Sequence, residues 1–293
     1  MKNVLTVLEI VAPVFGLGAI GFLWVRMGFE YSVPFVTRLS MTLAVPCLIF
    51  VALMQTQIAP ASISAVSFAS LVAYGLLSLI FLGLAAVLGL NRSSFVSPLI
   101  FGNTGNLGLP LALFAFGQTG LDYAVVIFAI MAVLSFTFGI WLVAGSGSFG
   151  RVIREPMVAA TLLGAVFLWQ GWQTPVFVTR TLDLVGQMGI PLMLITLGVA
   201  VARLKPGRLG TAMGLALLRA VLCIGVAFAV GRAFSLERVA FAVLILQVSM
   251  PVAVTSYMIA TKYGADADAV AGLVVASTVL SVFTIPLTLA FLI

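Results

Sequence analysis

Long apolar runs dominate the chain, and short polar or Gly- and Pro-containing stretches separate them. A helix needs about 20 apolar residues to cross a membrane. We expect ten such helices, at residues 5–25, 36–56, 66–90, 95–117, 122–145, 156–174, 179–201, 209–231, 238–260 and 269–292. The stretch QTQIAPAS at 55–62 divides one long uncharged run into two of them. Transmembrane β-strands alternate and are about ten residues long, so these continuous runs favour helices.

The composition fits a membrane protein and argues against an enzyme. The chain is 63% hydrophobic and 8% charged, whereas soluble domains carry roughly 25% charged residues. It contains no histidine, which excludes Ser-His and Cys-His nucleophile pairs and His-ligated zinc. An intramembrane aspartyl protease needs two aspartates, and only Asp183 qualifies. We therefore expect no catalytic residue, no metal and no bound cofactor.

The basic residues are scattered in loops, so we expect contact with lipid headgroups and no binding to nucleic acid. The loops after odd-numbered helices hold nine Lys and Arg residues, and the N-terminus with the other loops holds four. Since the richer side is normally cytoplasmic, both termini should face outward. Glu9 interrupts the first apolar run and no cleavage site follows, so we interpret this run as a retained helix and not a signal peptide.

Proline positions repeat between the two halves of the chain. Three pairs have offsets of 143, 145 and 141 residues: Pro13 and Pro156, Pro46 and Pro191, Pro110 and Pro251. We infer a duplication of five helices, with repeats at 1–145 and 156–293 and a short cytoplasmic linker at 146–155. Because five is odd, the second repeat is inverted in the membrane, and such halves can expose a site to each side in turn.

The stretch FGNTGNLGLP at 101–110 and its repeat partner LQVSMPVAVTS are unusually polar for membrane helices. Proline removes a backbone donor and each glycine costs about 1 kcal/mol, so we expect breaks near 103–110 and 248–252. The half-helices after the two prolines then point their positive N-termini at the bilayer centre, which favours an anion. The predicted substrate-binding residues are Asn103, Gly105, Asn106, Pro110, Gln247, Ser249 and Pro251. The alternative is that the glycines serve only close helix packing.

The chain resembles the auxin efflux carrier family, which includes plant PIN exporters and bacterial permeases. The resemblance rests on GNTGNLGLP (102–110), MPVAV (250–254), YGADADAVAGLVVASTVLSVFTIPL (263–287) and the ten expected helices. It implies an all-α membrane protein of two inverted five-helix repeats, with crossed broken helices 4 and 9 and outward termini.

The resemblance also implies transport of organic anions, which in bacterial relatives are dicarboxylates such as malonate or malate, across the inner membrane. The crossover prolines correspond to Pro110 and Pro251, and the polar crossover residue to Asn103 or Asn106. Plant members often carry a long regulated loop between the halves. Here the connection is short, so we expect no regulation of that kind.

Three further polar residues are candidates for the transport site. Arg219 lies eleven residues after Arg208, about 16 Å along a helix and so near mid-membrane. It either attracts the anion or pairs with a carboxylate or a helix C-terminus. Asp183 and Thr255 are candidates for coupling to Na⁺ or H⁺, although Asp183 can also be a solvated helix-end charge. We place no acidic residue at the midplane.

We therefore expect a secondary active transporter that moves a small mono- or dicarboxylate by alternating access. The alternative is a passive anion channel with the same polar residues in its pore. The expected partners are this substrate and the lipid bilayer, and a homodimer is left open.

Overall fold

The computed structural model describes residues 2–145, 156–204 and 209–293. The predicted linker at 146–155 lies outside the described residues. Within those ranges the chain forms helices and one isolated β-bridge, and no strand. The elements are α1 (Lys2–Arg26), α2 (Val33–Leu39), η1 (Ser40–Ala44), α3 (Val45–Gln55), α4 (Pro60–Val87), α5 (Arg92–Ile100), η2 (Thr104–Gly108), α6 (Leu109–Leu134), η3 (Ser135–Gly139), α7 (Ile140–Ala144), α9 (Pro156–Gln170), α10 (Val176–Gln187), α11 (Gly189–Arg203), α12 (Leu209–Ala233), α13 (Arg238–Val248), α14 (Val254–Tyr263) and α15 (Ala267–Leu292).

Seven helical runs in the described part are long and apolar enough to cross a membrane: Thr6–Arg26, Val33–Gln55, Pro60–Val87, Thr104–Ala144, Val176–Arg203, Gly210–Ala233 and Ala267–Leu292. The helices α9 and α13 are apolar but shorter. Many large apolar side chains lie on the outside of the helices, as a lipid environment requires. In its described part the chain is thus all-helical, as predicted, with seven helical runs that are long and apolar enough to span a membrane.

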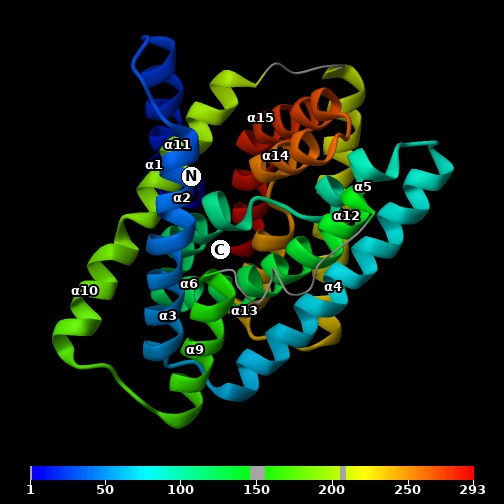
Figure 1. The fold of residues 1–293 in the computed structure, drawn as a ribbon. Helices are drawn as coiled ribbons and strands as arrows, with labels where there is room; N and C mark the ends of the chain where they lie inside the picture. Colours follow the sequence, from blue (N-terminus) through cyan, green and yellow to red (C-terminus); the bar gives the residue numbers. More distant parts are fainter. Residues whose placement is uncertain (1, 146–155, 205–208) are drawn as a thin grey trace.

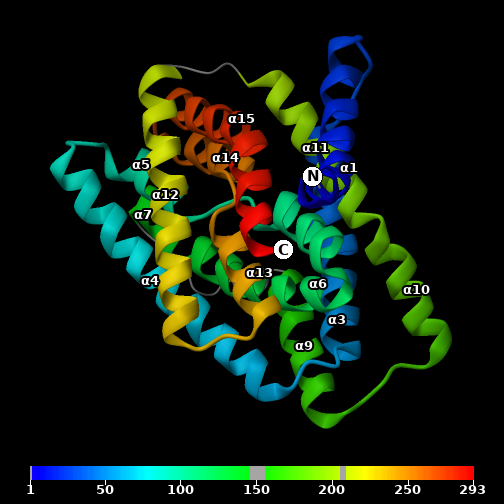
Figure 2. The same ribbon diagram turned by 180° about the vertical axis from the view of Figure 1, so that it is seen from behind.

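The helices gather in two groups (Figures 1 and 2). The helices α1, α2, α3, α9, α10 and α11 lie on one side, and α5, α12, α14 and α15 lie on the other. In the first group α1 packs closely on α11 because glycines bring the two backbones together. A Cβ on Gly198 would lie 1.8 Å from the carbonyl oxygen of Gly18, and a Cβ on Gly21 would lie 2.0 Å from that of Ile195. Small residues at membrane helix contacts serve this purpose.

Two helical runs are interrupted, as the sequence predicts. The first is non-helical between the end of α5 at Ile100 and the start of η2 at Thr104, and the second between Val248 and Val254. The first interruption, at residues 101–103, lies at the N-terminal edge of the predicted range 103–110. The chain resumes as a π-helical turn at Thr104 and continues directly into α6. Pro110 is the second residue of α6 and lies inside the helical run that begins at Thr104, so it does not itself mark the interruption.

The helix α6 is itself divided at Gly117. This residue has φ 65° and ψ −157°, a backbone conformation that costs little only for glycine. The division falls at the boundary expected between the helices at 95–117 and 122–145, so the long run Thr104–Ala144 contains two differently directed pieces.

Candidate functional site

The two interrupted segments are hydrogen-bonded to each other. Gly102 and Val252 form an antiparallel bridge, and the backbone N–H of Asn103 donates to the carbonyl oxygen of Pro251 at 2.7 Å. The N–H of Val252 donates to Oγ of Ser277 on α15 at 3.0 Å. Backbone groups that leave a helix at membrane depth need such partners. The breaks are therefore supported by the protein itself.

Gly102 allows the close approach of the two segments. A Cβ there would lie 2.7 Å from the carbonyl oxygen of Met250 and 3.0 Å from Nη2 of Arg219. A larger residue at this position would push the second break away from the first.

A cavity of about 250 Å³ borders the first break. Its wall includes Gly102, Asn103, Gly105 and Asn106, and α14 contributes Thr255 and Ser256 opposite them. Asn103 is 5% exposed, and its Nδ2 has no hydrogen-bond partner. Its Oδ1 accepts the backbone N–H of Asn106 at 3.3 Å. Asn103 therefore keeps an amide donor free beside the cavity.

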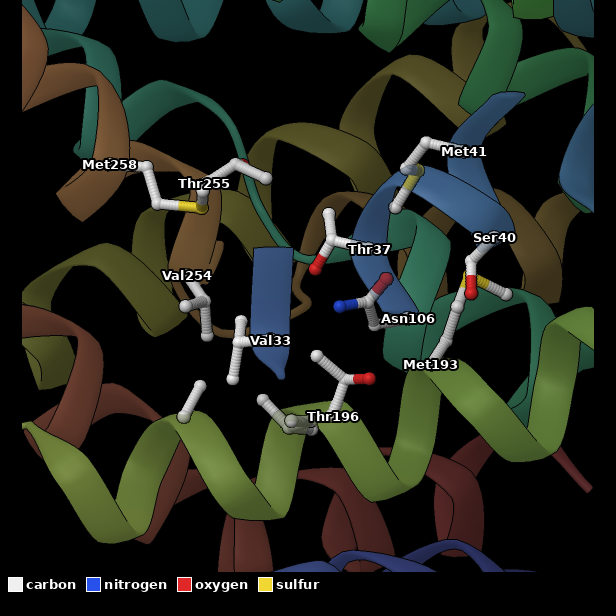
Figure 3. A pocket seen from close by; sticks show the side chains of 12 residues that line it. Val33, Thr37, Ser40, Met41, Asn106, Met193, Thr196, Val254, Thr255 and Met258 are labelled. Atoms are coloured by element: carbon white, nitrogen blue, oxygen red, sulfur yellow. The ribbon is translucent and has the colours of Figure 1, made fainter. Parts of the chain in front are cut away.

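A smaller pocket of about 20 Å³ adjoins this cavity. Figure 3 shows Asn106 between Thr37 of α2 and Thr196 of α11. The pocket and the cavity share Thr37, Met41, Asn106, Thr255 and Met258. Asn106 thus stands between two hollows and is only partly buried. No acidic or basic residue is among the described residues that border either hollow.

Arg219 links the two breaks from behind the cavity. Its Nε donates to the carbonyl oxygen of Leu99 at 2.9 Å, and its Nη1 donates to that of Met250 at 2.6 Å. Leu99 lies in the last turn of α5, where carbonyls lack helical partners. Arg219 is 1% exposed, and its Nη2 has no partner. The sequence left open whether Arg219 attracts the anion or pairs with a carboxylate or a helix C-terminus. The structure places its side chain at the C-terminus of α5, with Nη2 of the guanidinium unpaired.

Gln247 is fully buried in α13, and neither its Oε1 nor its Nε2 has a partner. It packs on η2, the π-helical turn that follows the first break, because a Cβ on Gly108 would lie 2.2 Å from its Oε1. Ser249 donates to the carbonyl oxygen of Leu246 at 3.1 Å and so ends its own helix.

The predicted site residues thus fall into two sets. Asn103, Gly105, Asn106 and Thr255 border the cavity. The others build the breaks around it and do not border it: Pro110, Arg219, Gln247, Ser249 and Pro251.

Asp183 lies apart from the cavity. It is exposed on α10, and its Oδ2 accepts Nε2 of Gln187 at 2.8 Å. It borders a separate hollow that also contains Asp122, a buried acid that the sequence analysis did not single out. Its proposed coupling role stays a prediction.

The sequence analysis also missed Thr37, Thr196 and Ser135, which border the hollows. They lie in α2, α11 and η3, outside the two segments where the sequence predicts breaks. The four-residue spacing of Thr37 and Met41, which puts both on one helix face, was the available indication.

Comparison with known proteins finds similarity to transporters. Residues 148–289 match the family described as "Membrane transport protein", a range that contains the motifs at 250–254 and 263–287. A Rhizobium meliloti protein named "Putative malonate transporter" is 25% identical over 301 residues, covering 94% of this chain and 92% of its own length. An uncharacterized transporter of Methanothermobacter thermautotrophicus is 26% identical over 301 residues, covering 98% and 96%. An uncharacterized transporter of Methanocaldococcus jannaschii is 24% identical over 202 residues, and the match spans 64% of each chain, less than two thirds of that relative.

Proposed function

We propose that this chain, whose residues 148–289 match the family described as "Membrane transport protein", is a membrane transporter that carries a small organic anion by alternating access. The substrate lies in the cavity of about 250 Å³ beside the first break. The observation that carries this proposal is the hydrogen-bonded contact between two interrupted helices beside a cavity. Asn103 borders this cavity, and its buried side-chain amide nitrogen has no hydrogen-bond partner.

Three features favour an anion in this cavity. The helical runs that begin at Thr104 and Val254 both start at the cavity, and each helix N-terminus carries about half a positive charge. The guanidinium of Arg219 lies directly behind Gly102. No acidic side chain is among the described residues of the cavity wall. A short mono- or dicarboxylate matches this charge, in agreement with the name of the Rhizobium relative.

The architecture that we propose has ten spans in two inverted repeats, 1–145 and 156–293, joined by the linker at 146–155. The paired breaks and the paired prolines support it, and the division of α6 at Gly117 accounts for two of the spans in one continuous run. With the basic loops on the cytoplasmic side, both termini face outward. The membrane would be the bacterial inner membrane.

Reconstituted protein tests the proposal. Proteoliposomes preloaded with unlabelled malonate should accumulate labelled malonate by counterflow, with saturation. Replacing Asn103 and Asn106 together by Leu removes the amide donors. Loss of one hydrogen bond to a charged group costs about 1.5–3 kcal/mol, so transport should fall by at least about tenfold. Asn91→Ser is the matched control, because Asn91 caps α5 away from the cavity.

Two results would contradict the proposal. Linear flux without counterflow would identify a passive channel. Stabilisation of the purified protein by neutral or cationic compounds only, in a thermal-shift screen against carboxylates with and without sodium, would exclude an anion.

A further inference from the structure

Two hollows meet at a buried carboxyl group that plays no part in the substrate cavity. One measures about 400 Å³ and the other about 160 Å³. They share Gln55, Gln118 and Asp122, and they share no residue with the substrate cavity. Gln55 and Gln118 are exposed, whereas Asp122 is 5% exposed. Asp122 therefore lies at the floor of a surface depression, almost closed off from water but next to it.

The described neighbours of Asp122 bring no cation to it, although two of them offer hydrogen bonds that favour its charged form. Its Oδ1 accepts Nε2 of Gln118 at 2.8 Å, and the side chain of Thr56 at the end of α3 is a second hydrogen-bonding neighbour. No lysine or arginine is among the described residues that border either hollow. Burying a carboxylate without a cation is costly, and the neutral acid avoids that cost.

The charged groups that face Asp122 are themselves acidic. Asp183 of α10 borders the smaller hollow, and Glu237 borders the larger one. Glu237 accepts a hydrogen bond from the hydroxyl of Tyr123. A like charge nearby disfavours ionisation of a carboxyl group.

The other helices packed on α6 bring no countercharge to this point. Among the described side chains, the ionisable residues of these helices border neither hollow: Glu9 and Arg26 on α1, Cys47 on α3, Tyr74 on α4 and Arg238 on α13. Arg238 is engaged elsewhere, because it donates to the carbonyl oxygen of Ile293 at 2.8 Å.

We propose that Asp122 is a proton-binding site that holds its proton in the conformation described here. A metal cation fits less well, because hard cations take about six oxygen ligands and the described residues contain no group of three or more acidic, His or Cys side chains that could hold one. A proton needs a single carboxyl oxygen. The hollow supplies the path to solution, and wider opening between α6 and α3 would hydrate the carboxyl group and release the proton.

This site goes beyond the proposed transport function, and its test needs no substrate. The chain contains four aspartates: Asp122, Asp183, Asp266 and Asp268. The full-length wild type would be labelled with ¹³C at the aspartate side-chain carboxyl carbon and measured by infrared spectroscopy at pH 7. We expect one isotope-shifted C=O stretch of a protonated carboxylic acid. It should vanish in Asp122→Asn and persist in Asp183→Asn, the matched control from the same hollow.

The wild-type spectrum alone can overturn the proposal, so the test holds even if Asp122→Asn does not fold. Four ionised aspartates at pH 7 would refute it. Persistence of the protonated band in Asp122→Asn would assign the proton to another residue and also refute it. Loss of the band on addition of sodium would identify a metal-cation site instead. None of these outcomes depends on malonate transport, which counterflow tests separately.

Discussion

The contact of Arg219 with both breaks makes its replacement the most informative perturbation. Arg219→Gln removes two charge-assisted hydrogen bonds, to the carbonyl oxygens of Leu99 and Met250. Each such bond contributes about 1.5–3 kcal/mol, so the variant should lose about 3–6 kcal/mol of stability. Arg219→Lys keeps the charge but cannot bond both carbonyl oxygens in the same geometry. It should lose about half as much stability as Arg219→Gln.

The assay is the melting temperature of purified protein in detergent, followed by malonate counterflow. At about 2 °C per kcal/mol for a chain of this size, Arg219→Gln should melt about 6 °C or more below the wild type. Arg232→Gln is the matched control on the same helix. Arg232 is exposed and lies over the rings of Phe228 and Phe241 at 5.5 and 5.6 Å, contacts that contribute only about 0.5–1 kcal/mol.

Comparison of Arg219→Lys with Arg219→Gln also distinguishes a structural role of Arg219 from attraction of the anion by its charge. If Arg219 only ties the breaks together, counterflow by Arg219→Lys should fall in proportion to its stability. If the free Nη2 also attracts the anion, Arg219→Lys should retain most transport and Arg219→Gln should lose it. Equal melting temperatures for the wild type, Arg219→Gln and Arg232→Gln would refute the reasoning, because the two hydrogen bonds would then carry no stability.

Two other predictions concern contacts away from the cavity. Gly198→Ala should destabilise the protein by about 1–3 kcal/mol or more, because the new Cβ would lie 1.8 Å from the carbonyl oxygen of Gly18. Gly16→Ala is the control, because a Cβ there would meet nothing within 4 Å. Equal melting temperatures of the two variants would contradict the close contact between α1 and α11. Burial raises the pKa of the Tyr31 phenol above 10.0, and the hydrogen bond between Tyr31 and Thr196 partly offsets this rise. The stability that Tyr31 contributes is therefore complete below about pH 10. It is lost as the pH rises through the folded-state pKa. At pH 8, Tyr31→Phe should be about 1 kcal/mol less stable than the wild type. Between pH 8 and pH 11, the variant should lose less stability than the wild type does. Equal losses of stability over this pH range in the two proteins would exclude Tyr31 as the cause.

The helices and their interruptions could be predicted locally. Each depends on a run of apolar residues or on glycine and proline, whose effects act within a turn or two of the chain. The divider at 55–62 is confirmed, since α3 ends at Gln55 and α4 begins at Pro60. The breaks before Thr104 and after Val248 are confirmed as well. The first lies at the N-terminal edge of its predicted range, and Pro110 lies inside the helical run that follows.

Side-chain partners could not be predicted in the same way. The sequence alone determined that this chain is a helical membrane protein with two polar interruptions, because hydropathy and backbone restrictions are properties of short segments. Only the tertiary structure decided that Arg219 bonds carbonyls of Leu99 and Met250 and that Asn106 stands between two hollows. It also decided that Asp122 is buried with no cation among the described residues that border its hollows. Those facts depend on which helix faces meet across the chain, and burial and electrostatics follow from that arrangement.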